Sequence, residues 1–276
     1  MRRVVCALLC LALLIAALPV GALAEGYAHT RLSPDEAGFI PADDGVELEY
    51  AVYGRADAQA VLLLAPNGSD MHFYDTYLVP ELAKTYRVVT FSTRGVGRTA
   101  HGEGKLTFDR DADDCVCVLD ALGIDRAYVF GFSDGGNLAL VLAVNHPERV
   151  AKLIPMSANI RQRGLKLRYQ IAFTAQWLGL CVKCWFVRTD EARNYRDVIG
   201  KMVGQPKLRF SDLEGIRVPT LNIYGEHDLF WKCHSRGITE SIPGCRELVV
   251  PDGGHSDCFT QTDTVLLPAI LSFFAE

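Results

Sequence analysis

The chain has 276 residues, of which 49% are hydrophobic and 22% charged, and its formal net charge is −5. These proportions are typical of a globular protein and exclude a fibrous or largely disordered chain. The acidic balance, without a lysine- or arginine-rich tract, argues against nucleic acid as a partner.

The first 24 residues have the order of a secretory signal. Met1-Arg2-Arg3 is basic, residues 4–18 are continuously apolar, and Ala22-Leu23-Ala24 supplies small residues for cleavage. We therefore expect a signal peptide at residues 1–24, a mature domain at 25–276 and a secreted or extracytoplasmic location. An N-terminal membrane anchor is the alternative, because residues 4–24 could just span a bilayer. Cleavage would leave no stable membrane span.

Beyond the signal, short apolar runs alternate with longer helical patterns, which predicts an α/β fold. The sheet is expected to be mostly parallel, with helices on both faces. Strands are expected at residues 45–54, 61–64, 87–91, 128–131, 151–156, 220–224 and 246–250. Helices are expected at 108–122, 134–146 and 259–275, with Pro268 able to kink or split the last one.

Residues 160–212 interrupt this rhythm because they contain no clear strand. A strongly apolar helical segment at 169–187 predicts a short helical lid inserted over one end of the sheet. Its aromatic and leucine side chains could form the lid core, the wall of an acyl pocket, or both. The basic residues before and within it could steer an anionic substrate or form a solvated face; they are Arg161, Arg163, Lys166 and Arg168.

The chain has nine cysteines, two of them within the first 24 residues. The odd number that remains argues against a complete disulfide framework outside the cytoplasm. The pair Cys181-x-x-Cys184 could be a redox pair or half a metal site, but no second pair or nearby histidine completes a tetrahedral set. Buried thiols are favoured, and neither a metal nor an organic cofactor is expected.

The segment GFSDGG, residues 131–136, lies between an expected strand and an expected helix. Glycine tolerates backbone angles that a side chain forbids, so its glycines predict a sharp turn that exposes the Ser133 hydroxyl. This G-x-S-x-G pattern is typical of a nucleophile elbow. A helix N-cap is the alternative for this serine.

Two later segments supply partners for Ser133. PTLNIYGEHD ends in Asp228, and PDGGHS places His255 just after the last expected strand. All three residues follow the carboxyl ends of expected parallel strands, where functional loops gather. Their order, Ser-Asp-His, is that of an α/β serine hydrolase. His255 would take the serine proton, and Asp228 would fix the histidine tautomer.

These motifs resemble the α/β-hydrolase superfamily over residues 36–275, and are similar to its valacyclovir-hydrolase-like bacterial esterases. The segments that carry the resemblance are Asn67–Asp70, Thr93–Thr99, Gly131–Gly136, Gly225–Asp228 and Gly253–His255. The resemblance implies an oxyanion hole made by the backbone N–H groups of Asn67 and Asp134. Two positions depart from the family pattern: Ala65-Pro66 replaces a His-Gly pair, and Ser92 stands where aspartate is common.

Several neighbours have alternative interpretations. The Asp134 side chain is expected to be a first-turn carboxylate favoured by the helix dipole, with a catalytic acid as an alternative. The resemblance implies a contact to a cationic substrate as a further alternative. Asp252 and Asp257 are rivals of Asp228 for the triad. His227 is expected to shape its loop, and Arg94 to pack the end of a strand.

Together these features predict a secreted or envelope-facing serine hydrolase that acts on a small-molecule carboxylic ester through an acyl-enzyme. Amide, thioester or C–C bond hydrolysis on the same triad is the chemical alternative. A weakly catalytic ligand-binding protein of the same fold is the alternative from another class. Dehalogenase and epoxide-hydrolase chemistry needs a carboxylate nucleophile, so the serine at position 133 argues against both. The oligomeric state is not readable from the sequence.

Overall fold

The computed structural model describes residues 32–256, 259 and 261–276, so the expected signal peptide lies outside the described residues. Within this part of the chain, eight strands form one sheet in the order β1-β2-β4-β3-β5-β6-β7-β8. The pairs β1–β2 and β2–β4 are antiparallel, and the remaining pairs are parallel. The strands are β1 (Glu36–Pro41), β2 (Glu47–Tyr53), β3 (Ala60–Leu64), β4 (Arg87–Phe91), β5 (Ala127–Phe132), β6 (Val150–Met156), β7 (Leu221–Gly225) and β8 (Arg246–Val250).

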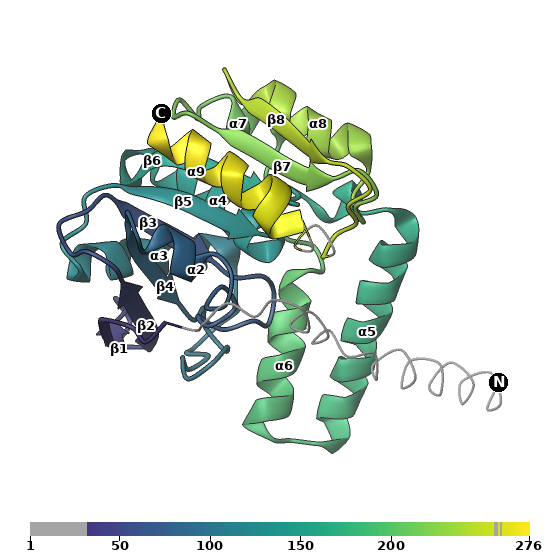
Figure 1. Ribbon diagram of the computed structural model, residues 1–276. Helices are drawn as coiled ribbons and strands as arrows, with labels where there is room; N and C mark the ends of the chain where they lie inside the picture. The colour runs from purple at the N-terminus through teal and green to yellow at the C-terminus, as the bar shows by residue number, and fades with distance from the viewer. Residues whose placement is uncertain (1–31, 257–258, 260) are drawn as a thin grey trace.

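Helices cover both faces of the sheet (Figure 1). In the fully buried strand β3, Val61 and Leu63 point into one apolar core, and Leu62 and Leu64 point into the other. The first core includes α2 and α9, and the second includes α3 and α4. The helices are α2 (Val79–Leu82), α3 (Phe108–Ala121), α4 (Asp134–Asn145), α5 (Leu167–Phe186), α6 (Asp190–Lys201), α7 (Phe210–Leu213), α8 (Lys232–Ser241) and α9 (Leu267–Ala275).

The predicted fold class is confirmed, and a strand is found in each expected region. The sequence did not indicate β1, a largely exposed edge strand in which only Ile40 is buried. Such a strand lacks the apolar run or strict alternation that marks a strand in sequence.

The last helix differs from the expectation of one helix over residues 259–275. α9 begins at Leu267, after a π-helical turn at Thr262–Leu266, and Pro268 lies in its first turn. Proline fits there because the first N–H groups of a helix have no intrahelical acceptor. Pro268 therefore lies at the start of α9, and the expected helix is split just before it, not kinked.

Between β6 and β7, α5 and α6 form an antiparallel helical hairpin that projects from the body of the molecule (Figure 1). Cys181 and Cys184 lie in α5 as free thiols, and Cys184 Sγ donates to the carbonyl oxygen of Ala192 in α6. The second cysteine thus helps to join the two helices. Among the described residues, none of the helices has the length and hydrophobicity needed to cross a membrane.

Candidate active site

Ser133 occupies a strained turn between β5 and α4. Its φ of 56° and ψ of −118° lie outside the regions that most residues adopt. A Cβ on Gly131 would lie 2.0 Å from the carbonyl oxygen of Gly135, and one on Gly135 would lie 1.9 Å from that of Leu64. Both positions therefore require glycine. Ser133 is the N-cap residue of α4 by position, but its hydroxyl makes no capping bond and faces His255 instead.

The three residues expected to form the triad meet at the carboxyl edge of the sheet. His255 Nε2 lies 2.9 Å from Ser133 Oγ, although the two residues are 122 positions apart in the chain. On the other side of the ring, His255 Nδ1 lies 2.7 Å from Asp228 Oδ1. Both distances are within hydrogen-bonding range. Ser133, His255 and Asp228 are therefore connected by two consecutive hydrogen bonds.

Asp228 is held in its ionised form despite being buried. Burial raises the pKa of its carboxyl, but the His255 imidazole, the Ser157 hydroxyl and the Leu229 backbone N–H together bring that pKa below its usual value. The Leu229 N–H donates to Asp228 Oδ1 at 2.6 Å. A carboxylate that stays charged beside the ring favours a protonated imidazole during a reaction.

Aromatic rings pack on the histidine. The Phe230 ring lies edge-on to the His255 ring with centroids 5.4 Å apart, and the Phe132 ring lies 5.0 Å away. The His255 side chain is 18% exposed. Solvent therefore reaches the ring only in part, while packing restricts its orientation.

Asp252 does not take the place of Asp228. Its backbone N–H donates to Glu226 Oε2 at 3.4 Å, while His255 is bonded to Asp228. The other rival, Asp257, lies outside the described residues. The backbone at His227 joins the two site loops, because the His227 N–H donates to the carbonyl oxygen of Gly253 at 2.8 Å.

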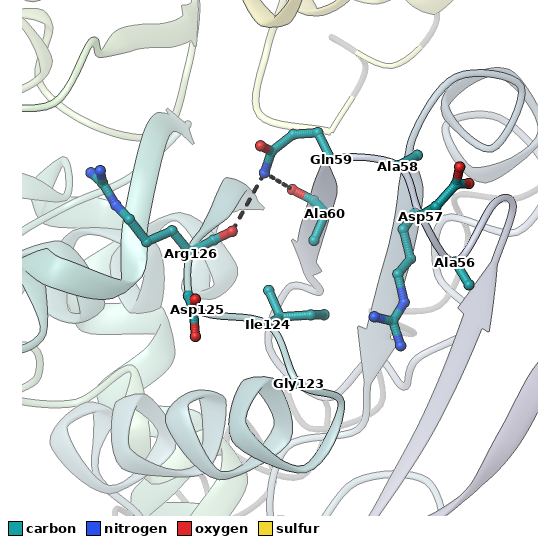
Figure 2. A pocket seen from close by; sticks show the side chains of 10 residues that line it. Ala56, Asp57, Ala58, Gln59, Ala60, Gly123, Ile124, Asp125 and Arg126 are labelled. Carbon is teal, nitrogen blue, oxygen red and sulfur yellow. Dashed lines mark hydrogen bonds between the residues drawn. The ribbon is translucent and has the colours of Figure 1, made fainter.

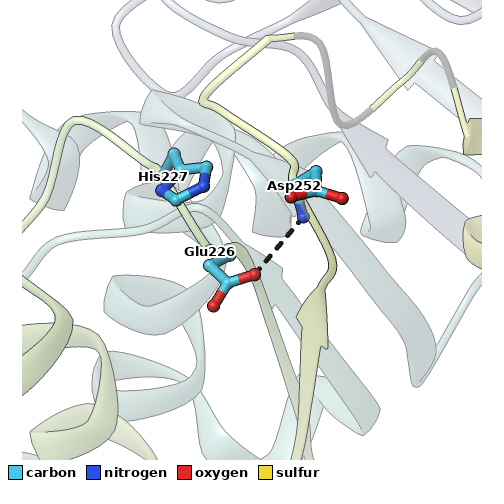
Figure 3. Close-up of side chains that lie close together, drawn as sticks. All are labelled: Glu226, His227 and Asp252. Carbon is cyan, nitrogen blue, oxygen red and sulfur yellow. Dashed lines mark hydrogen bonds between the residues drawn. The ribbon is translucent and has the colours of Figure 1, made fainter.

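Glu226, His227 and Asp252 form a small exposed cluster beside these loops (Figure 3). One potential metal-ligand atom from each lies within 4.8 Å of the others. Lys232 Nζ already lies 3.5 Å from Glu226 Oε1 and balances part of the negative charge. These residues could contact a cation, but their contacts are also those of an ordinary solvated loop.

The two residues expected to form the oxyanion hole are also adjacent. Asn67 Nδ2 donates to Asp134 Oδ2 at 2.8 Å and to the carbonyl oxygen of Val198, in α6, at 2.8 Å. The Asp134 amide belongs to the first turn of α4, where N–H groups lack intrahelical acceptors. The Asn67 side chain thus joins the loop after β3, the first turn of α4 and the helical hairpin.

Asp134 belongs to a buried line of polar side chains that the sequence did not reveal. Asn137 Nδ2 donates to Asp134 Oδ1 and to Asn159 Oδ1, both at 3.1 Å. The backbone N–H of Asn159 donates back to Asn137 Oδ1 at 2.7 Å. We refer to Asn67, Asp134, Asn137 and Asn159 as the inner polar chain.

Burial raises the pKa of the Asp134 carboxyl, although Lys201 and the bond from Asn67 act in the opposite direction. Lys201 Nζ itself bonds to Asp111 Oδ2 at 2.6 Å in the interior. Asp134 is a first-turn carboxylate as expected, but its side chain faces these interior partners.

Ser92 braces the loop that carries Asn67. Its hydroxyl accepts from the Met71 backbone N–H at 3.1 Å and donates to Glu49 Oε2 at 3.2 Å. Glu49 also accepts from the backbone N–H of Arg98 at 2.9 Å. The serine that replaces the common aspartate therefore still connects this loop to the sheet.

A shallow hollow at the opposite edge of the sheet is unrelated to this site (Figure 2). Residues 56–60 and 123–126, which precede β3 and β5, line most of it. Gln59 Nε2 closes part of it by donating to the carbonyl oxygens of Ala60 and Arg126. It lies at the amino ends of the strands, away from Ser133.

Known proteins are similar to nearly the whole chain. Residues 60–178 match the sequence profile of the alpha/beta hydrolase fold. RutD of Caulobacter sp. (strain K31), named for a proposed carbamate hydrolase activity, is 30% identical over 260 residues, covering 83% of this chain and 96% of that protein. The chain belongs to the α/β-hydrolase family.

Other members of the α/β-hydrolase family support this assignment. Human serine hydrolase BPHL is 27% identical over 229 residues, covering 77% of this chain and 78% of that protein. A hydrolase structure from Pseudomonas aeruginosa superposes with a TM-score of 0.71 at 22% identity, covering 88% of this chain and all of that one. The family expected from the motifs is confirmed, and this α/β-hydrolase is a hydrolytic enzyme.

Proposed function

We propose that Ser133, His255 and Asp228 are a catalytic triad that hydrolyses a small-molecule carboxylic ester. The observation that carries this proposal is the pair of contacts made by one imidazole, 2.9 Å to Ser133 Oγ and 2.7 Å to Asp228 Oδ1. A serine hydroxyl is a poor nucleophile at neutral pH and needs a base within hydrogen-bond reach.

In the first step, Ser133 Oγ attacks the ester carbonyl carbon while His255 Nε2 takes the hydroxyl proton. The carbonyl π electrons move onto oxygen and form a tetrahedral oxyanion. When the carbonyl re-forms, the bond to the alcohol breaks and the imidazolium gives its proton to the departing oxygen. Asp228 stays ionised and stabilises the imidazolium.

In the second step, water replaces the alcohol. His255 removes one proton from the water, and the resulting hydroxide oxygen attacks the acyl carbon. The bond to Ser133 Oγ then breaks, and the histidine returns its proton to the serine. The products are the carboxylic acid and the original enzyme, with Ser133 and His255 back in their starting protonation states.

The backbone N–H groups of Asn67 and Asp134 are proposed to bind the oxyanion. One such donor is worth about 3 kcal/mol in the transition state. The side-chain bond from Asn67 to Asp134 supports this assignment because it fixes the spacing of the two residues that carry the donors. In this proposal the Asn67 backbone N–H contacts the oxyanion, and the Asn67 side chain only positions that N–H.

Carbamate hydrolysis is the second candidate, favoured by the name of the RutD relative and its coverage of the chain. A carbamate presents the same carbonyl carbon to Ser133, but its nitrogen makes that carbon less electrophilic. Amide, thioester and C–C bond hydrolysis need the same triad and remain alternatives. A ligand-binding protein with little catalysis is the alternative from another class.

A fluorophosphonate probe and a substrate panel test the proposal. We expect the probe to label the wild type and not Ser133→Ala, since it reacts with an activated serine. The panel contains p-nitrophenyl esters of increasing chain length and the matching p-nitrophenyl carbamate. Faster turnover of the esters supports ester hydrolysis, faster turnover of the carbamate supports the second candidate, and an unlabelled wild type would favour the ligand-binding protein.

The helical hairpin is proposed to act as a lid. α5 begins next to the triad, because Lys166 Nζ donates to the carbonyl oxygen of Asp228 at 2.5 Å and the Lys166 N–H donates to that of Leu229 at 2.9 Å. α6 reaches the other side of the site through the bond from Asn67 to Val198. Both ends of the hairpin therefore contact the site.

We also propose that the protein is exported. The basic, apolar and small-residue order of residues 1–24 supports this location. Edman sequencing of the protein recovered after expression in a bacterial host tests it. A chain that begins at Glu25 in the extracytoplasmic fraction supports cleavage, and an intact N-terminus in the membrane fraction supports the anchor.

A further inference from the structure

The outer face of α5 is an apolar stripe without a partner among the described residues. Trp185 is 75% exposed, and four other residues along the helix are also exposed: Leu167, Ile171, Leu178 and Val182. At about 100° per residue, these five side chains fall within an arc of roughly 60°. We refer to these five residues as the α5 stripe.

The α5 stripe lies opposite the buried face of the same helix. The buried residues of α5 are Gln176, Leu180 and Cys184, and their mean direction is roughly 160° from the stripe. One face of α5 is therefore buried, and the stripe on the other face stays exposed. At 1.5 Å per residue, the stripe runs for about 27 Å along the projecting hairpin (Figure 1).

The charge around the α5 stripe is one-sided. Residues 160–189 contain six basic side chains and no acidic one, in a chain with a net charge of −5. Arg163 and Arg168 are exposed near the start of the stripe, and Lys183 and Arg188 are exposed near its end. The next acidic residues along the chain, Asp190 and Glu191, begin α6, and Asp190 is paired with Arg193. Asp197, which lies near Cys181 of α5, is paired with Arg196.

We propose that the α5 stripe docks the enzyme on an anionic lipid surface. An apolar helix face flanked by lysine and arginine, with aromatic residues at one end, is suited to lie in the plane of a membrane interface. Trp185 and Phe186, which is 81% exposed, supply those aromatic rings. Phosphate groups of anionic lipids complement the basic side chains.

A second copy of the chain fits this surface less well. Pairing two stripes, whether parallel or antiparallel, would place the basic ends of one helix against the basic ends of the other. An anionic bilayer meets the same side chains with opposite charge. The proposal does not depend on the bond that the enzyme cleaves.

Cosedimentation of the full-length enzyme with vesicles tests the docking. The probes are vesicles of phosphatidylcholine alone and vesicles that also contain phosphatidylglycerol. We expect the enzyme to partition at least tenfold more onto the anionic vesicles and to be released by 0.5 M salt, because the attraction is partly screened. Trp185→Ser/Phe186→Ser and Arg168→Glu/Lys183→Glu should each lower that partitioning about tenfold or more.

The matched control is Phe39→Ser, which removes a 43% exposed ring from the edge strand β1, away from the hairpin. This variant should bind like the wild type. Residues 1–24 are present in every protein compared, so any binding that they contribute is the same in all of them. Circular dichroism of each variant verifies folding. Equal binding by the α5 variants and the wild type would overturn the proposal, and so would a dimer in light scattering that Trp185→Ser/Phe186→Ser abolishes.

Discussion

Two regions on either side of Ser133 each bury one carboxylate, and the two carboxylates behave in opposite ways. In the triad region the pKa of Asp228 is lowered, because His255, the Ser157 hydroxyl and the Leu229 N–H together outweigh burial, which is the largest single influence and raises the pKa. In the inner polar chain the pKa of Asp134 is raised, because burial dominates despite Lys201 and Asn67. The partners of a buried acid, and not its burial alone, decide its charge.

Two histidines of the protein also differ in their surroundings. His255 is bonded to a carboxylate, whereas His234, in α8, accepts the backbone N–H of Ile160 at Nε2, 3.2 Å away. Burial lowers the pKa of His234 to about 4, with a smaller contribution from Arg161. His255 thus lies against a carboxylate, whereas the surroundings of His234 disfavour its protonated form.

The largest expected effect comes from removing the charge of the triad acid. Asp228→Asn should lower kcat by about 10⁴-fold, because an amide at this position favours the wrong histidine tautomer. Steady-state kinetics on a p-nitrophenyl ester measures the loss. Asp252→Asn is the matched control and should change kcat less than twofold. Comparable losses in the two variants would show that Asp228 has been assigned the wrong role.

The second effect concerns His234 and the free energy of unfolding. Its pKa is about 4 in the folded protein and about 6.5 when unfolded. Since the unfolded state binds the proton more readily, this contribution is complete above pH 6.5 and is lost as the pH falls towards 4. Protonation should cost about 2 to 3 kcal/mol between pH 7 and 4.5.

Urea unfolding at the two pH values measures this cost. His234→Gln keeps a side-chain acceptor for the Ile160 N–H but does not titrate, so its stability should fall less between pH 7 and 4.5 than that of the wild type. If both proteins lose the same free energy over this range, His234 does not have the lowered pKa in solution.

A third test inserts a charge into the inner polar chain. Asn67→Asp would place a second carboxylate next to Asp134, and two carboxylates in contact cannot both be ionised easily. We expect kcat at pH 8 to fall about a hundredfold, with a new ionisation in the pH profile of kcat.

The control for this test is Asn67→Ala, which keeps the backbone amide and removes only the side-chain bonds. It should lower kcat about tenfold and leave the shape of the pH profile unchanged. Wild-type kinetics for Asn67→Ala would contradict a positioning role for the side chain.

The smallest effect is expected from Asp134→Asn. The amide keeps the size of the carboxylate and can still accept a bond from either Asn67 or Asn137, but not from both. Loss of one hydrogen bond to this buried side chain should cost about 1 to 2 kcal/mol of stability, and kcat should stay within tenfold. A loss as large as that of Asp228→Asn would make Asp134 part of the chemistry.

The sequence carries strong local signals for the triad region. Ser133 is flanked by glycines, and Asp228 and His255 each follow an apolar strand, so their places at one edge of the sheet could be predicted. The inner polar chain has no such signal. The bond from Asn67 to Val198 spans 131 positions, and that from Lys201 to Asp111 spans 90.

The edge strand β1 and the helix α8 were missed for related reasons. β1 exposes most of its side chains, and α8 buries only His234, Ser235 and Ile238. Both segments contain few apolar residues, so neither stands out in the sequence. Both are stabilised by neighbours that come together only after the chain has folded.

In the hairpin, Asn67 donates to the backbone carbonyl oxygen of Val198, so no substitution of the Val198 side chain would remove this acceptor. Side chains along α6 could be exchanged to suit another substrate while this bond persists. Deleting one residue of α6 before Val198 would turn the rest of the helix by about 100° and carry the oxygen away. Attempts to graft a different hairpin onto this enzyme should therefore preserve helix register before they optimise residue identity.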